Sequence, residues 1–353
     1  MSENDSLQSE QYRGILWVLG VISAVVLVVM IVLGLWWGEP PKPFNVFDEA
    51  VIRTKDTNTT NNMPIGYVYS NTLAHIAEVL LHKPGGYITN DVAPPGLLLD
   101  NIASWEFGAL VILRDATSAL RNHFARDQSQ SAEDPDLAIA EPYFYYERNS
   151  WALPSTEAEY QKGIDALHNY MTRLQNPDAS RGKGKGKKAH FYPRADNLWQ
   201  YVELVIKRLG GISTRLAASD AGNFVRELTA QKTLALTATE QNTMDQKTTP
   251  LTQTPWMEID NIFYEARGAS WALLHVLKAI EHDFRDILLD KRAMNTVDIM
   301  IHALENSLAP TLSPVVLNGS GYGLFANYSL TMANYISRAN AAALDLRDIM
   351  NRG

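Results

Sequence analysis

Residues Ile15–Trp37 read ILWVLGVISAVVLVVMIVLGLWW, a run of 23 positions without a charged side chain. As an α-helix rising about 1.5 Å per residue, this run is roughly 34 Å long, enough to cross a hydrocarbon core of about 30 Å. Trp17 lies near one end and Trp36 and Trp37 near the other, where indole side chains favour the headgroup level. The sequence therefore predicts one transmembrane helix near the N-terminus.

The end of the apolar run indicates that this helix is a signal anchor and is not cleaved. Bulky indoles at Trp36 and Trp37 stand where a cleavage site needs small side chains. Basic residues do not fix the orientation, because Arg13 precedes the run and Lys42 follows it. We expect residues 1–14 to be a short cytoplasmic tail, 15–37 the anchor in a bacterial inner membrane, and the rest periplasmic, since long domains translocate largely regardless of charge.

Composition excludes several kinds of site and function for this protein. The 353-residue protein has no cysteine, which excludes disulfides, thiolate metal sites and cysteine nucleophiles and suits an oxidising compartment. Its net charge of −8 argues against nucleic-acid binding. The part beyond the anchor is long enough to bury its own core.

Periodicity beyond the anchor is helical. Residues 38–64 are rich in Pro, Thr and Asn and predict a flexible spacer, and residues 65–353 predict an all-α, bundle-like domain. We expect a short extended piece at Pro142–Tyr146. The helices are expected at about 67–83, 100–128, 155–175, 196–218, 221–240, 260–289, 292–308 and 326–351.

An internal repeat relates segments 95–124 and 255–284 with a constant shift of 160 residues. This pattern indicates either a duplicated helical unit or two segments that converged on the same way of starting a helix. A partial third copy begins at Pro193. The identical pairs are Pro95/Pro255, Asp100/Asp260, Asn101/Asn261, Ile102/Ile262, Gly108/Gly268, Ala109/Ala269, Leu113/Leu273 and Phe124/Phe284.

The repeated polar residues fall at predicted helix starts and the repeated glycines inside the helices. We expect the aspartates to act as N-caps, with a catalytic role as the alternative. Gly108 and Gly268 each cost about 1 kcal/mol relative to Ala in a helix, so we expect them at close helix crossings. The polar positions are Asp100, Asn101, Asp196, Asn197, Asp260 and Asn261.

Three stretches of sequence resemble an uncharacterised bacterial membrane-protein family that is catalogued as domain of unknown function 2333. They are Gly86–Gly108, Phe191–Leu198 and Met332–Asn340. The resemblance extends over most of the chain from the anchor to the C-terminus. It implies a proteobacterial envelope protein and supplies no catalytic or binding residue.

Histidines recur with a seven-residue spacing at His75 and His82 and at His275 and His282. With Glu78 they would form a metal site if two helices brought them together. On a helical wheel, however, each pair lies opposite the apolar stripe. We therefore expect solvated faces rather than metal ligands, with a pH-sensing or partner-binding surface as a further alternative.

A basic, glycine-rich run, RGKGKGKK, spans 181–188 between two predicted helices. It is too rich in glycine to predict order. We expect either an exposed loop tip or a contact for anionic lipid or an acidic envelope protein. Its cationic residues are Arg181, Lys183, Lys185, Lys187 and Lys188.

No catalytic motif emerges, and the sequence predicts no cofactor and no metal ligand set. The expected function is therefore an interaction or scaffold module of the cell envelope. The alternative is an envelope hydrolase that acts on cell-wall or lipid material with paired carboxylates, which need to lie about 5–10 Å apart in one cleft. Its candidate acids are Asp91, Asp100, Glu106, Asp196 and Asp260.

Overall fold

A computed structural model describes residues 3–54, 63–126, 133–175, 188–236, 254–311, 313, 315–319 and 326–352. These residues form helices and contain no β-strand, apart from an isolated bridge between Asn318 and Asn327. The prediction of an all-α fold is confirmed. The helices in the first half of the chain are α1 (Glu3–Trp37), α2 (Val46–Thr54), α3 (Tyr67–His82), η1 (Gly96–Leu98), α4 (Asp100–Ala119), η2 (Leu120–Phe124), α5 (Pro135–Phe144) and α6 (Thr156–Gln175).

The second half of the chain continues with α7 (Ala195–Leu236), η4 (Trp256–Glu258), α8 (Ile259–Asp283), α9 (Arg285–Asp290), α10 (Met294–Ser307) and α11 (Tyr328–Asn351). Helix α7 covers two of the predicted helices, which form one continuous element. The predicted helix 260–289 is instead divided at Phe284 into α8 and α9.

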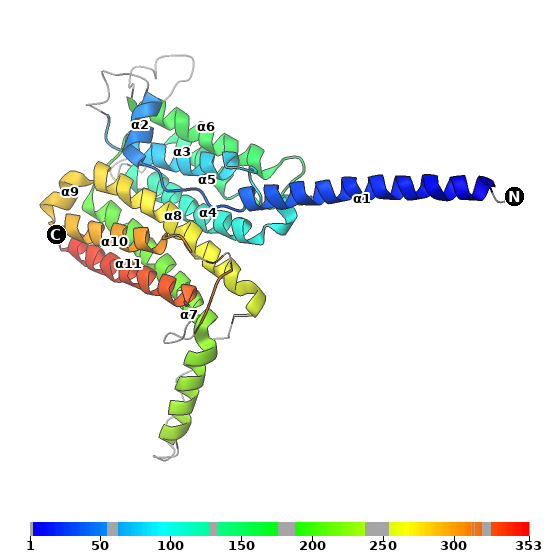
Figure 1. Ribbon diagram of the computed structural model, residues 1–353. Coiled ribbons are helices and arrows are strands. Elements are labelled where there is room, and N and C mark those ends of the chain that lie inside the picture. The colour runs from blue at the N-terminus through cyan, green and yellow to red at the C-terminus, as the bar shows by residue number, and fades with distance from the viewer. Residues whose placement is uncertain are drawn as a thin grey trace.

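Helices α4 and α8 form the centre of the bundle. They pack most extensively against each other; α3, α5 and α6 lie on one side of the pair and α7, α10 and α11 on the other (Figure 1). Trp105 and Trp271, one from each central helix, are almost completely buried, with ring centroids 5.1 Å apart. One continuous hydrophobic core therefore runs through both halves of the bundle.

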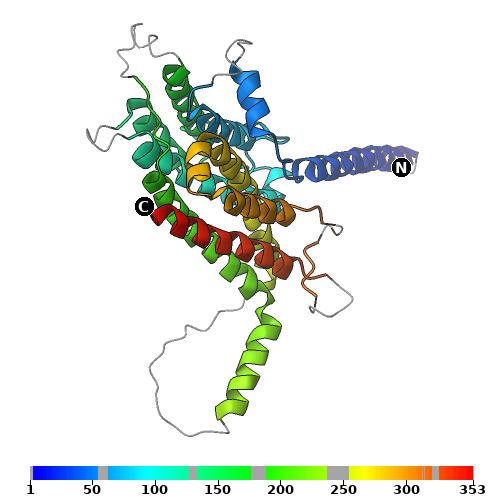
Figure 2. The ribbon, with the colours of Figure 1, turned by 90° about the vertical axis from the view of Figure 1, so that its left-hand side faces the viewer.

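Helix α1 projects from one end of the domain, whereas α9 lies at the opposite end (Figure 1). It is the only helix in the described part of the chain that is long and apolar enough to cross a membrane, and none of its apolar window is buried. A second projection is the C-terminal half of α7, which leaves the bundle in another direction (Figure 2).

Two local predictions were wrong. Residues 38–54 are not a flexible spacer, because α2 packs on the bundle and buries Val46 and Ala50. Pro142–Tyr146 is not extended, because its first residues complete α5, with Pro142 inside that helix. In the first stretch, the burial of Val46 and Ala50 outweighs the turn-forming composition.

Candidate functional site

The connection between α1 and α2 fixes the apolar helix to the domain. Trp37, the last residue of α1, packs on Gly85, where a Cβ would come within 2.7 Å of the indole ring. Gly85 also has a φ of +84°, a conformation that a side chain would disfavour. Beyond Trp37 the chain crosses the domain, and Phe44 stacks on His275 with ring centroids 3.8 Å apart. The base of α1 is thus held at two points.

His275 is fully buried, so the expectation of a solvated histidine face was wrong at this position. Its Nε2 accepts a hydrogen bond of 2.9 Å from the Phe44 N–H, and its Nδ1 lies 2.6 Å from the carbonyl oxygen of Trp271. Because Nε2 accepts, the proton of the neutral ring sits on Nδ1 and is donated to Trp271. Burial lowers the pKa of His275 to about 3, and this histidine is therefore neutral at physiological pH.

His75 and Glu78 take part in a polar cluster between α2, α3 and α6. Arg53 of α2 donates from both terminal nitrogens to Glu78 of α3, at 2.9 and 2.5 Å. Its Nη1 also lies 2.8 Å from Nε2 of His168 on α6. His75 Nδ1 is 3.6 Å from Glu78 and 3.7 Å from Glu49. A single carboxylate therefore connects three helices.

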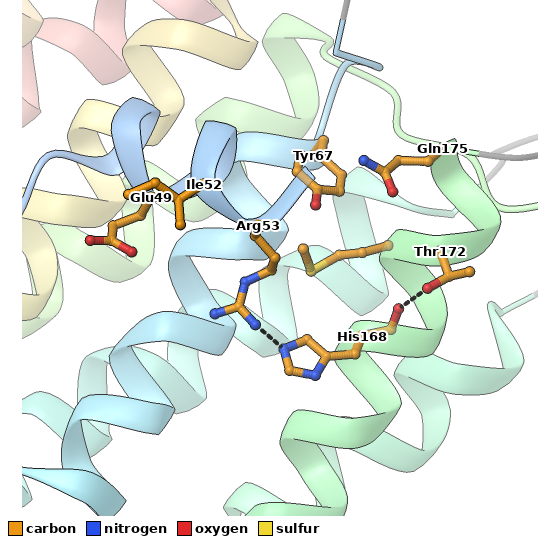
Figure 3. Close-up of a pocket in the computed structure, with 8 residues that line it drawn as sticks. Glu49, Ile52, Arg53, Tyr67, His168, Thr172 and Gln175 are labelled. Atoms are coloured by element: carbon orange, nitrogen blue, oxygen red, sulfur yellow. Dashed lines mark hydrogen bonds between the residues drawn. The ribbon is translucent and has the colours of Figure 1, made fainter. Parts of the chain in front are cut away.

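Arg53, His168 and Glu49 of this cluster also line an open pocket of about 510 Å³ (Figure 3). In the figure, Arg53 reaches across from α2 toward His168, with Tyr67 and Gln175 on the opposite rim. Burial would raise the pKa of Glu78, but contacts with His168, His75 and Arg53 outweigh it and hold that pKa well below its usual range. Glu78 is thus a permanent anion rather than an acid or base near neutral pH. The lining residues are Glu49, Ile52, Arg53, Tyr67, His168, Met171, Thr172 and Gln175.

Among the candidate acids, Glu106 is buried, ion-paired and hydrogen-bonded inside the domain. Its carboxylate lies 2.5 Å from Nζ of Lys83, and the two side chains are almost completely buried. It also accepts hydrogen bonds of 2.8 Å from the backbone N–H groups of Ile88 and Thr89. Glu106 therefore fixes the segment after α3, and it has no free oxygen aimed into a cleft.

Asp91 lies near this ion pair at the same end of the domain. Burial raises its pKa, and the negative charges of Glu106 and Glu157 add to the effect. Asp91 is nevertheless covered on one side by the chain at Gly96, where an added Cβ would overlap its carboxylate. The pair Asp91 and Glu106 thus supports a folded loop rather than an open catalytic cleft.

The predicted N-caps require a correction. Asp100 is the first residue of α4 and Asp260 the second residue of α8, and neither Leu99 nor Glu258, the residues before these helices, makes a side-chain cap. Each aspartate instead accepts a bond of 3.0 Å from the N–H of the next residue, Asn101 or Asn261. The two aspartates therefore stabilise the starts of α4 and α8 through the interaction of their negative charge with the helix dipole.

The other polar positions at helix starts make tertiary or local contacts. Asn261 Oδ1 accepts a 3.1 Å hydrogen bond from Ser104 of α4, which ties the starts of the two central helices together. Asp196, in the first turn of α7, pairs with Arg194 at 3.1 Å. Asn197 donates to the carbonyl oxygen of Tyr192 at 3.1 Å. These contacts are structural, and they lie on separate parts of the bundle.

Gly108 and Gly268 both lie where α4 and α8 cross. A Cβ at Gly108 would overlap the carbonyl oxygen of Glu265, and one at Gly268 would overlap that of Trp105. The contacted residues are themselves 160 positions apart, so the repeat shift relates the two halves of the crossing. A close approach of the two backbones therefore accounts for both glycines.

Arg181, Lys183, Lys185 and Lys187 lie outside the described residues. Lys188 is described and is exposed. In the described part of the chain, no group of three or more His, Asp or Glu residues could hold a metal ion. Phe44, Arg53 and His168 were not predicted as site residues, because an isolated aromatic, arginine or histidine carries no pattern of its own.

The fold and these contacts define a class: an all-α bacterial domain that carries one apolar N-terminal helix. The chain belongs to the family described as an uncharacterised protein conserved in bacteria, domain of unknown function 2333, which it matches over residues 10–353. No curated protein and no solved structure matches it. The resemblance noted in the sequence is confirmed.

Proposed function

We propose that this protein is a single-pass protein of the bacterial inner membrane whose helical domain lies in the periplasm and serves as an interaction or scaffold module of the cell envelope. The observation that carries the proposal is the exposure of the apolar side chains of α1. Most of its large apolar side chains from Ile15 to Leu35 are 42–75% exposed, and Met30 and Leu33 are partly exposed. A helix of this length and composition is stable without protein partners only in a bilayer.

The attachment of α1 supports a positioning role. A flexible tether would leave the domain free to move, whereas here Trp37 packs on the loop after α3 and Phe44 packs on α8. The domain therefore keeps a fixed orientation relative to the bilayer. A fixed orientation suits a scaffold, because it presents the same faces to other envelope components.

The state of the carboxylates supports binding rather than hydrolysis. Glycoside hydrolysis needs two carboxyl groups that share one cleft and exchange protons. Glu106 is held by Lys83 and two backbone amides, and Glu78 by Arg53. Asp100, Asp196 and Asp260 lie at the starts of three different helices. We therefore do not propose the hydrolase alternative.

The pocket between α2, α3 and α6 is the surface that we assign to a partner. It combines the apolar Ile52 and Met171 with the polar Thr172 and Gln175, beside a balanced group of charges. A peptide segment with alternating apolar and polar side chains fits such a lining better than a small anion, because Arg53 is already paired with Glu78.

Two measurements test the proposal. Alkaline phosphatase fused after Gly353 should be active in bacteria, whereas a reporter that needs the cytoplasm should be inactive at the same position; the reverse result would contradict the orientation. A photo-crosslinking residue at Ile52, which is 67% exposed, should give a discrete crosslinked band in cells.

As a control, the photo-crosslinking amino acid would replace Ile299. This residue is 46% exposed on α10, away from the pocket. A band that appears equally at both positions would reflect random collision. No band at Ile52 would remove the pocket from the proposal, while the phosphatase result would stand on its own.

A further inference from the structure

Segment Asp91–Asp100, which leads into α4, exposes three large apolar side chains. Val92, Leu97 and Leu98 are 59%, 59% and 71% exposed. The segment contains the short helix η1 and lies against α1. An apolar cluster of this kind on a surface that faced only water would be unfavourable.

This segment packs beside the last turn of α1, on the side of Trp37 that lies within the apolar run. Pro95 and Leu99 lie within van der Waals reach of the position that a Cβ would take at Gly34, at 3.8 Å each. Gly34 is three residues before Trp37, which places it roughly 4.5 Å further along the helix. If Trp37 lies at the membrane interface, the side chains of η1 lie at the depth of the acyl chains.

An open apolar groove of about 580 Å³ is lined by α1 and by the segment around η1. Its walls are almost entirely apolar, so water is a poor occupant and an acyl chain a good one. The lining residues are Ile22, Ser23, Val26, Leu27, Met30, Ile31, Gly34, Pro95, Leu98 and Leu99.

A second exposed apolar loop lies beside the first. Trp151 is 65% exposed and Leu153 is completely exposed, in the connection between α5 and α6. Asn90 Nδ2 donates a 3.0 Å hydrogen bond to the carbonyl oxygen of Ser150, which ties this loop to the start of the first. Figure 1 shows the α5–α6 connection at the end of the domain from which α1 leaves.

We propose that loops 91–100 and 150–154 insert into the leaflet from which α1 emerges, so that the domain rests on the lipid surface through a second, monotopic contact. Leucine side chains enter the acyl region and the Trp151 indole lies at the headgroups, as in interfacial anchors. The ligand class is the phospholipid bilayer itself. This inference rests on the proposed function, because it requires α1 to span the membrane.

The absence of cysteine from the chain makes a direct depth measurement feasible. Single-cysteine variants L97C, L98C and L153C of the full protein would be labelled with an environment-sensitive fluorophore. The proteins would then be reconstituted in phosphatidylcholine and phosphatidylglycerol vesicles that carry a spin-label quencher near the headgroup or deep in the acyl chain. We expect at least two-fold quenching at all three positions, strongest with the shallow quencher.

Two further positions separate the outcomes. L289C, 54% exposed on α9 at the far end of the domain, should not be quenched, and V25C, 57% exposed in the middle of the apolar run, should be quenched most by the deep probe. Quenching at Val25 without quenching at the three loop positions would overturn the insertion and leave the anchor intact. No quenching at Val25 would overturn the spanning helix itself, and with it both proposals.

All five positions are exposed leucines or valines, so the variants should keep the stability of the parent protein. Quenching of L97C and L98C but not of L153C would overturn the two-loop form of the proposal. Equal quenching at L289C would show a non-specific surface association, and would likewise overturn it.

Discussion

Gly108 of α4 and Gly268 of α8 occupy reciprocal positions in one helix crossing. Each glycine lies against a backbone carbonyl of the other helix, Glu265 in one case and Trp105 in the other. The contacted pair is related by the same 160-residue shift as the glycines. A duplicated helical unit and independent convergence on a close crossing both produce this geometry.

Substitution of either glycine by alanine should destabilise the protein. Alanine favours a helix by about 1 kcal/mol over glycine, but here its methyl group would overlap a backbone oxygen and push α4 and α8 apart. We expect a net loss of about 1–3 kcal/mol for Gly108→Ala and for Gly268→Ala. Chemical denaturation of the full chain in mild detergent would measure it.

Gly211 provides a matched control for these substitutions. It lies inside α7 with nothing within 4 Å of its missing Cβ. Gly211→Ala should therefore gain up to about 1 kcal/mol. A gain at Gly108 or Gly268 as well would contradict the close crossing.

The buried His275 should make stability depend on pH below neutrality. Its pKa is lowered to about 3 in the folded protein, against about 6.5 when unfolded. Between these values the unfolded state binds more protons, so stability falls as pH drops from about 6.5. The limiting slope for this one group is about 1.4 kcal/mol per pH unit.

His275→Gln removes this titration. The difference between the denaturation free energies of parent and variant should shrink as pH falls from 6.5 to 5, a range above the ordinary pKa of carboxylates. Burial also lowers the pKa of His123, but that effect is common to both proteins and cancels. Parallel curves over this range would contradict a neutral His275 bonded to Phe44.

The Lys83–Glu106 pair should be costly to break from one side. Glu106→Gln removes the negative charge and leaves the buried ammonium of Lys83 without a countercharge, bonded only to the carbonyl oxygen of Gly86. Loss of one partner of a buried pair typically costs about 3–5 kcal/mol. The double variant Lys83→Met with Glu106→Gln should recover part of this loss, because no charge is then left buried. The amide oxygen can still accept from one of the two N–H groups, those of Ile88 and Thr89, which bond different carboxylate oxygens in the parent protein.

The partly exposed ion pair between Lys278 and Glu305 is the control for this measurement. Glu305→Gln, which breaks the half-exposed pair with Lys278, should cost about 0–1 kcal/mol. If Glu106→Gln were equally mild, Lys83 would have to reach water in the folded protein, and the rigid loop after α3 would no longer be supported.

The basic run at 181–188 should be dispensable for stability. Replacement of Lys183, Lys185, Lys187 and Lys188 by serine is expected to change the free energy of unfolding by no more than about 0.5 kcal/mol, because the sequence predicts an exposed loop tip there. Thermal denaturation followed by circular dichroism would measure the change. A larger loss would show that the run has a structural role.

The sequence alone predicted most of the secondary structure. Helical periodicity predicted most of the helices, and the uncharged run Ile15–Trp37 predicted the apolar helix, because both depend on patterns that repeat along the chain. It also placed Gly108 and Gly268 inside helices, where their cost required a reason.

Contacts between distant segments required the tertiary structure. The wheel placed His275 opposite the main apolar stripe and hence in solvent, but Phe44 covers that face from a segment 231 residues away in sequence. Likewise, Arg53 meets Glu78 and His168 only because three helices converge. A helical pattern records which side of one helix is apolar. Which segment covers the other side, and which charges meet there, depends on long-range packing, and only the folded chain decides it.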